Sequence, residues 1–175
     1  MRKIILSLVM LVAASCAFGQ DAEYLIKQYR KVKGAEYENM TKTIKKAAKK
    51  DKYINPKYYE LLSRVKKIEY LTVKLNENER EALTKNLENI DGFNNLFAKK
   101  NNVESLFNKN FSLFKNIQYF GIEENGIVKE VIVRIDAMKD NDIMTVIIHV
   151  EGEITLEEMM KMVDFSENKT VTIQD

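Results

Sequence analysis

The amino-acid sequence predicts a single α+β domain, in which an antiparallel sheet of about four to five strands has helices covering one of its faces. A hairpin is the first sign of the sheet. Residues 117–124 and 127–136 flank Asn125-Gly126, a dipeptide that tolerates the positive φ angles of a type I′ turn, and alternation places most apolar residues of the second segment on one face. Residues 143–151 alternate in the same way. Elsewhere apolar residues recur three and four positions apart, which indicates helices.

The first elements are short and alternate between helix and strand. Asp21 can cap a helix over residues 22–32 that stops at Gly34, and residues 35–40 follow as a short strand. Residues 41–50 then predict a second helix, with its apolar residues on one side and lysines elsewhere.

The middle of the chain contains two further helices and a strand. Pro56 follows a capping Asn and starts a helix, because proline suits the first helical position. Residues 68–75 alternate as a strand. Asn76 and Glu79 then have the spacing of a capping box for the next helix. Residues 93–115 are ambiguous, although their apolar spacing suits short helices.

The last strands predict which face of the sheet is buried. Gly152 closes the strand over residues 143–151, and Thr155 with Glu158 forms a capping box for a final helix. We expect the apolar face of the last two strands to point into the core, with His149 on the other face. The residues of that apolar face are Ile127, Val131, Val133, Ile135, Met144, Val146, Ile148 and Val150.

Residues 1–19 predict a signal peptide. A basic start precedes an apolar run that is shorter than the ~20 residues of a membrane-spanning helix. Small residues, Gly19 among them, favour cleavage before Gln20. The alternative is lipidation of Cys16, since residues 13–16 resemble a bacterial lipobox with Ala where Leu is usual. Cleavage gives a periplasmic or secreted protein, and lipidation gives a lipoprotein anchored to the outer membrane.

Composition limits the chemistry that this chain can perform. Residues 20–165 hold no repeat or Pro-, Gly- or Ser-rich linker and form one domain, with a flexible tail at 166–175. The 175 residues include one Cys and one His, which largely excludes thiol catalysis, zinc sites and Ser-His triads of the ordinary patterns. Lys and Arg number 28 against 26 Asp and Glu. Loss of Arg2 and Lys3 with the signal makes these numbers equal, so we expect no nucleic-acid partner.

The candidate catalytic residues have simpler structural interpretations. A general base needs a partner and a pocket, so we interpret His149 as a partly exposed strand residue that pairs with a nearby carboxylate. A glycosidase needs two carboxylates across a cleft, and calcium needs several oxygens from one loop. We interpret the close carboxylate pairs as polar hairpin loops, and we assign no catalytic, cofactor-binding or metal-ligating residue. Those pairs are Glu123-Glu124, Asp140/Asp142 and Glu151/Glu153.

A run of lysines followed by tyrosines is the best candidate for a binding surface. Lysines at this spacing cover much of a helix and could meet anionic lipid, phosphate or an acidic glycan, while tyrosines could stack on sugar rings. The alternative is a solvated helix face that serves solubility. The candidate residues are Lys42, Lys45, Lys46, Lys49, Lys50, Tyr53 and Tyr59.

Several segments together resemble a known family. Residues 127–135 contain a hydrophobic–Lys–Glu–hydrophobic strand, and residues 146–156 an apolar strand, a Gly and the start of a helix. Residues 29–34 form a Tyr-x3-Lys-Gly helix end, and residues 35–50 and 68–73 fit the same layout. The chain resembles a family of small secreted proteins of unknown function that is typical of Bacteroidetes. The resemblance implies an extracytoplasmic bacterial protein and supplies no catalytic residues.

These observations favour a non-enzymatic exported domain, envelope-associated or secreted, that binds an envelope or extracellular partner through its surface. We expect no cofactor, and contact with a membrane only if Cys16 is lipidated. Two alternatives stay open: a carboxylate-based envelope hydrolase, and a basic-surface binder of anionic envelope polymers.

Overall fold

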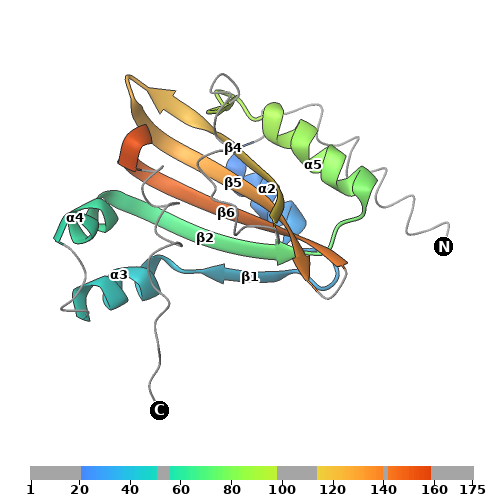
Figure 1. Ribbon diagram of the computed structural model, residues 1–175, viewed down its shortest axis with the longest axis horizontal. Helices are drawn as coiled ribbons and strands as arrows, with labels where there is room; N and C mark the ends of the chain where they lie inside the picture. Colours follow the sequence, from blue (N-terminus) through green and yellow to red (C-terminus); the bar gives the residue numbers. More distant parts are fainter. Residues whose placement is uncertain (1–20, 51–55, 98–113, 140–141, 159–175) are drawn as a thin grey trace, which may run out of the picture.

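The computed structural model describes residues 21–50, 56–97, 114–139 and 142–158 of the chain. One antiparallel sheet of six strands organises them, in the order β1-β2-β6-β5-β4-β3 (Figure 1). The predicted α+β class with a single sheet is therefore confirmed. The strands are β1 (Glu36–Asn39), β2 (Val65–Val73), β3 (Asn94–Asn95), β4 (Phe114–Glu124), β5 (Ile127–Lys139) and β6 (Asp142–Thr155). The helices are α2 (Ala22–Tyr29), α3 (Thr41–Lys50), α4 (Pro56–Arg64) and α5 (Glu77–Glu88).

The prediction of four to five strands was wrong, because it missed the short strand β3. Its two residues pair with Phe120 and Gly121 of β4. A strand of this length has no room for an alternating pattern, so its sequence carries no signal. β3 lies in the ambiguous range 93–115, of which residues 98–113 lie outside the described residues.

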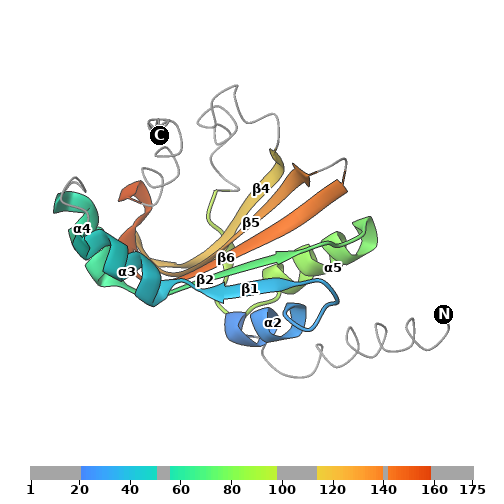
Figure 2. The ribbon, with the colours of Figure 1, turned by 90° about the horizontal axis from the view of Figure 1, so that it is seen from below.

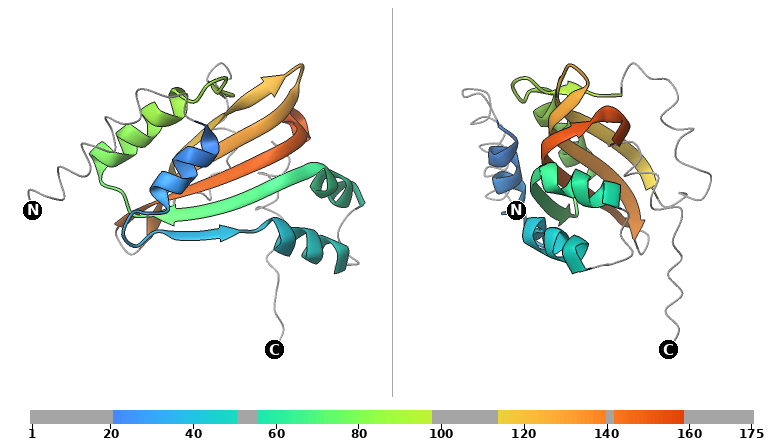
Figure 3. Two further views of the ribbon diagram at one scale, coloured as in Figure 1. Left: turned by 180° about the vertical axis from the view of Figure 1, so that it is seen from behind. Right: turned by 90° about the vertical axis from the view of Figure 1, so that its left-hand side faces the viewer.

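The helices occupy two places on the sheet. α2 and α5 lie on one face, here called the helix face (Figures 2 and 3). α3 and α4 lie side by side at one end of the sheet. Leu61 of α4 joins an apolar cluster on the opposite face together with Tyr119 and Val131. The predicted covering of one face by helices therefore holds for α2 and α5 but not for α4.

The predicted core face of the last two strands holds only the smaller of the two apolar clusters, in which Val133 and Val150 pack against the group that includes Val131. Val131 is buried as expected, but Met144, Val146, Ile148 and Val150 are only half-buried. The most deeply buried side chains point the other way, toward α2 and α5, and include Leu71, Thr145, Ile147, His149 and Ile132, all at 0 % exposure. The helix face can be buried although it is partly polar, because its charged side chains pair with one another.

The local turn and cap predictions are confirmed. Asn125 and Gly126 have φ angles of 55° and 81°, as a type I′ turn between β4 and β5 requires. The capping box of Asn76 and Glu79 forms at the start of α5. Thr155 and Glu158 form theirs at the end of β6, and residues 159–175 lie outside the described residues.

Gly152 does not close the last strand, because β6 continues to Thr155. A Cβ atom at Gly152 would lie 2.9 Å from the carbonyl oxygen of Arg64 and 3.0 Å from the Cα of Val65. The glycine therefore allows the end of α4 and the start of β2 to approach β6 closely.

In the part of the chain that the structure describes, every helix is too short or too polar to cross a membrane. The predicted signal peptide lies outside these residues and stays a prediction.

Candidate functional site

A buried charged cluster on the helix face is centred on His149. The three strands at the middle of the sheet supply it: Glu69 and Lys67 come from β2, His149 and Glu151 from β6, and Glu130 from β5. Glu69 is the register partner of His149, and Glu130 is the register partner of Glu151. Strand alternation places all five side chains on one face.

Both ring nitrogens of His149 face carboxylates. Nδ1 lies 2.9 Å from Oε2 of Glu69, and Nε2 lies 2.8 Å from Oε1 of Glu130. Nε2 is also 3.8 Å from Oε1 of Glu151. Burial by itself lowers the pKa of His149, but the hydrogen bonds to Glu130 and Glu69 outweigh it and the pKa lies above its ordinary value. The two carboxylates therefore favour the protonated form of this buried ring.

Glu69 has three donors around its carboxylate. The hydroxyl of Tyr37 on β1 donates to Oε1 at 2.6 Å, while Oε2 accepts from His149 and contacts Nζ of Lys67 at 3.2 Å. Burial acts to raise the pKa of Glu69, yet the hydrogen bonds from Tyr37, His149 and Lys67 bring it below its ordinary value. Glu69 is therefore an ionised carboxylate with its oxygens occupied.

Two cations, Lys67 within the cluster and Arg30 beside it, lie at its sides. Lys67 bridges Glu69 and Glu151, with Nζ 3.2 Å from an oxygen of each. The guanidinium carbon of Arg30 lies 3.6 Å from the ring centroid of Tyr37, a cation–π contact that covers the tyrosine. Burial, followed by the hydrogen bond to Glu69, raises the pKa of Tyr37, so its hydroxyl stays a donor.

The outer side of the cluster is reachable from solvent. The side chain of His149 is 0 % exposed, whereas those of Glu130 and Glu151 are 26 % and 36 % exposed. Glu130, His149 and Glu151 each offer one metal-ligand atom, and these atoms lie within 4.8 Å of one another. They are the three described side chains that could hold a metal ion together.

The interpretation of His149 from sequence was half right. Its pairing with carboxylates is confirmed, but the expected partial exposure was wrong. Its partners Glu69 and Glu130 lie 80 and 19 residues away in sequence. The signal that could have revealed them is the recurrence of polar residues on the same alternating face of β2, β5 and β6.

The close carboxylate pairs were interpreted as polar hairpin loops, and for Glu151 and Glu153 this was wrong, because both lie within strand β6. Glu151 belongs to the cluster, while Glu153 forms an ion pair with Lys129 at 3.2 Å. Asp142 forms one with Lys74 at 2.5 Å, and Asp140 lies outside the described residues. Glu123 and Glu124 are exposed beside the hairpin turn, as the prediction of a polar hairpin loop expects.

A second buried charge pair lies farther along the helix face and was missed by sequence reasoning. The guanidinium of Arg134 contacts Asp136 at 2.6 Å, and Thr145 donates to the same carboxylate at 2.8 Å. Arg134 also donates to the carbonyl oxygen of Arg80 in α5 at 3.1 Å and to the hydroxyl of Thr84. This pair anchors α5 to the sheet, so its role is structural.

The predicted lysine surface lies on α3. The start of this helix is fixed to β2, because the hydroxyl of Thr41 accepts from the backbone N–H of Ile68 at 2.8 Å. Lys42, Lys46 and Lys49 are exposed and Lys45 is half-buried. None of these four lysines forms an ion pair with another described residue. Tyr53 and the side chains of Lys50 and Tyr59 lie outside the described residues.

Residues 19–162 match the family described as "Domain of unknown function (DUF4252)". The predicted membership of a family of unknown function is therefore confirmed. No curated protein and no solved structure matches the chain significantly.

Proposed function

We propose a function from the premise that the chain belongs to the DUF4252 family. The protein is an exported, non-enzymatic binding domain that contacts anionic polymers of the cell envelope through the lysine face of α3. The basic start and short apolar run of residues 1–19 support export.

The unpaired lysines of α3 are the observation on which this proposal rests. Four lysines elsewhere in the described chain form ion pairs, namely Lys27, Lys67, Lys74 and Lys129. The lysines of α3 differ in that Lys42, Lys45, Lys46 and Lys49 lie together on one helix without such a pair. The first turn of α3 holds no acidic residue, so nothing on the helix offsets the positive charge there. A row of cations without internal partners creates a local positive potential that attracts polyanions.

The position of α3 makes this charge accessible. The helix projects at one end of the sheet, away from α2 and α5 (Figures 1 and 2). Its contacts with β2 and α4 hold it in place, and Lys42, Lys46 and Lys49 stay exposed. A fixed helix presents its charges without the entropy cost of ordering a loop.

The cluster around His149 gives weaker support for the alternative of a carboxylate-based hydrolase. A general acid of that kind needs a pKa raised toward neutrality. The pKa of Glu69 is lowered instead, and both nitrogens of His149 are engaged by carboxylates. We therefore assign no catalytic role to this cluster.

The test uses the chain from Gln20 to Asp175 and measures its binding to lipopolysaccharide micelles at several salt concentrations. We expect the variant with Lys42→Gln, Lys46→Gln and Lys49→Gln to bind about tenfold more weakly and with less salt dependence, since screening acts over ~8 Å at physiological ionic strength. Alginate, an acidic glycan without phosphate, then shows whether phosphate is required.

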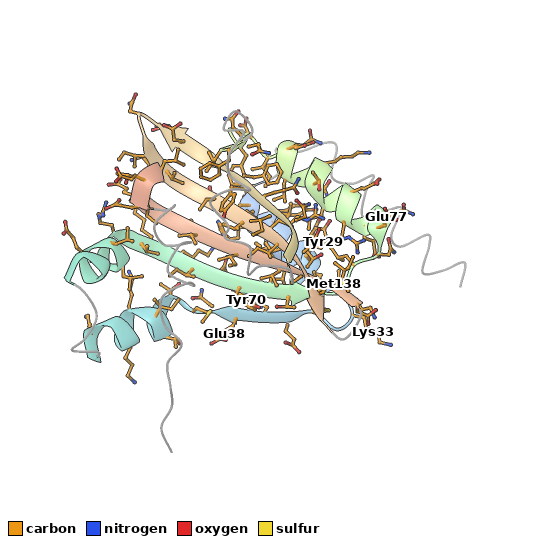
Figure 4. The ribbon with its side chains drawn as sticks, in the orientation of Figure 1. Tyr29, Lys33, Glu38, Tyr70, Glu77 and Met138 are labelled. Atoms are coloured by element: carbon orange, nitrogen blue, oxygen red, sulfur yellow. The ribbon has the colours of Figure 1, made fainter. Side chains whose placement is uncertain are left out.

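The matched control replaces three exposed lysines elsewhere with glutamine: Lys31, Lys33 and Lys85. Lys33 lies at the far end of β1 from α3 (Figure 4). The control changes the net charge by the same amount but leaves the lysines of α3 in place, so it should bind like the unchanged protein. Equal losses in both variants, or no saturable binding to either polymer, would reject the α3 surface.

A further inference from the structure

We propose that Glu130, His149 and Glu151 form a binding site for a divalent transition-metal ion of the Zn²⁺ type. Two neighbouring strands supply the ligands, and their ligand atoms lie within 4.8 Å of one another. The site has neither the cysteines nor the paired histidines of ordinary zinc motifs, so sequence spacing does not reveal it.

The distances suit a tetrahedral ion. Ligand atoms about 2.0–2.2 Å from zinc are about 3.3–3.6 Å from one another in that geometry. Nε2 of His149 lies 2.8 Å from Oε1 of Glu130 and 3.8 Å from Oε1 of Glu151. The two observed distances lie on either side of the required value, so rotations of the two glutamate side chains adjust them.

Glu69 orients the ring of His149 in the way that a carboxylate usually orients a metal-binding histidine. Metal-binding histidines almost always donate their second ring N–H to a carboxylate or carbonyl, which fixes the tautomer and the ring orientation. Here Nδ1 faces Oε2 of Glu69 at 2.9 Å, and Tyr37 and Lys67 fix Glu69 in turn. The ring therefore directs Nε2 at Glu130 and Glu151.

The charges around the site also suit a divalent cation. When Nε2 is deprotonated, the carboxylates of Glu69, Glu130 and Glu151 face the single ammonium group of Lys67. An ion of charge +2 balances the remaining two negative charges. Lys67 then gives up its contact with Glu151 and keeps the one with Glu69.

The ion reaches the site from the solvent side. His149 forms the buried floor, and the partly exposed side chains of Glu130 and Glu151 form the rim. Three protein ligands leave a fourth position for water or for a group of a partner. Binding exchanges the proton on Nε2 for the metal ion and releases that proton, with no change of oxidation state.

The ligand types select the metal. Mg²⁺ and Ca²⁺ prefer oxygen ligands alone, whereas one imidazole with two carboxylates suits Zn²⁺. The three ligands lie on strands rather than on loops, so the sheet fixes their positions before the ion arrives.

The experiment uses the tag-free chain from Gln20, which holds one His and no Cys, and titrates it with Zn²⁺ by calorimetry. We expect one ion per chain, and no comparable binding of Mg²⁺. Glu130→Gln and Glu151→Gln should each weaken binding by about tenfold or more. Glu153→Gln is the matched control, because this residue is also on β6 but pairs with Lys129. It should bind Zn²⁺ as the unchanged protein does.

Nitrogen NMR of the single imidazole gives a second, independent measurement. Zn²⁺ should shift the Nε2 resonance and leave Nδ1 protonated, because Glu69 accepts that proton. Absence of 1:1 binding below about 100 μM Zn²⁺ would overturn the proposal. Equal affinity in the Glu130, Glu151 and Glu153 variants would overturn it as well.

Discussion

The carboxylate of Glu69 lies 2.9 Å from Nδ1 of His149, although 80 residues separate them in sequence. They are direct partners in the register of β2 and β6, near the middle of the sheet. The same histidine meets Glu130 of β5 on its other nitrogen. One ring thus links three strands through charged hydrogen bonds, which are about twice as strong as neutral ones.

Tyr37→Phe should lower the free energy of unfolding by about 1–2 kcal/mol, because it removes the hydroxyl that donates to Glu69 at 2.6 Å. The ring under Arg30 remains, so packing is preserved. Urea denaturation measures the change. Tyr24→Phe is the matched control, since Tyr24 is an exposed tyrosine on α2. Equal stability of the two variants would show that the Tyr37 hydroxyl contributes nothing.

Glu158 should make the stability depend on acid pH. The hydrogen bond from Arg64, with smaller contributions from Thr155, lowers the pKa of Glu158 from 4.5 to about 2. A carboxyl with a lowered pKa in the folded state stabilises that state above its unfolded pKa. This contribution is therefore complete above about pH 4.5 and is lost as the pH falls toward 2.

The measurement compares the unchanged protein with Glu158→Gln in urea between pH 7 and pH 2. The variant should be less stable at pH 7, and the difference should shrink as the pH falls below about 4.5. Glu124→Gln, at an exposed site beside the hairpin turn, should show no such trend. A difference that stays constant with pH would contradict the role of the ion pair with Arg64.

The local signals of the sequence predicted most elements correctly. The Asn125-Gly126 turn, the capping box of Asn76 and the proline at the start of α4 each act within a few residues. Such signals need no knowledge of distant partners, since the physical interaction itself is local. β3 was missed because two residues carry no pattern.

The buried face of the sheet could not be inferred in the same way. On β5, Val131 and Val133 alternate with Glu130 and Arg134, and the apolar side was expected to be the core. α2 and α5 cover the polar side instead. That arrangement is favourable only when each charge meets its partner, and the partners lie on other strands. The register between strands therefore decides which side chains meet in the site, and this register is not visible in the sequence of any single segment.

Gly152→Ala should lower the free energy of unfolding by about 1–3 kcal/mol. The added methyl would lie 2.9 Å from the carbonyl oxygen of Arg64, a backbone atom that cannot rotate away. Thermal or urea unfolding measures the loss. Glu153→Ala changes the exposed neighbouring position and should cost much less. Similar losses in the two variants would mean that β2 and β6 move apart to accept the methyl group.

Arg134→Met should be among the most destabilising single changes, because it leaves the carboxylate of Asp136 buried without its cation. Removing one partner of a buried ion pair costs about 3–5 kcal/mol. Replacing both partners with apolar residues of similar volume is often far less costly. The double variant Arg134→Met with Asp136→Leu should therefore be more stable than Arg134→Met alone.

The double variant should not recover full stability. Arg134 also donates to the carbonyl oxygen of Arg80 and to Gln118, and Thr145 loses its acceptor when Asp136 is removed. Urea unfolding of the two single variants and the double variant gives the coupling free energy of the pair. A coupling near zero would mean that the attachment of α5, rather than the charge pair, accounts for the loss, because the contacts of Arg134 with Arg80 and Thr84 are absent from Arg134→Met and from the double variant alike.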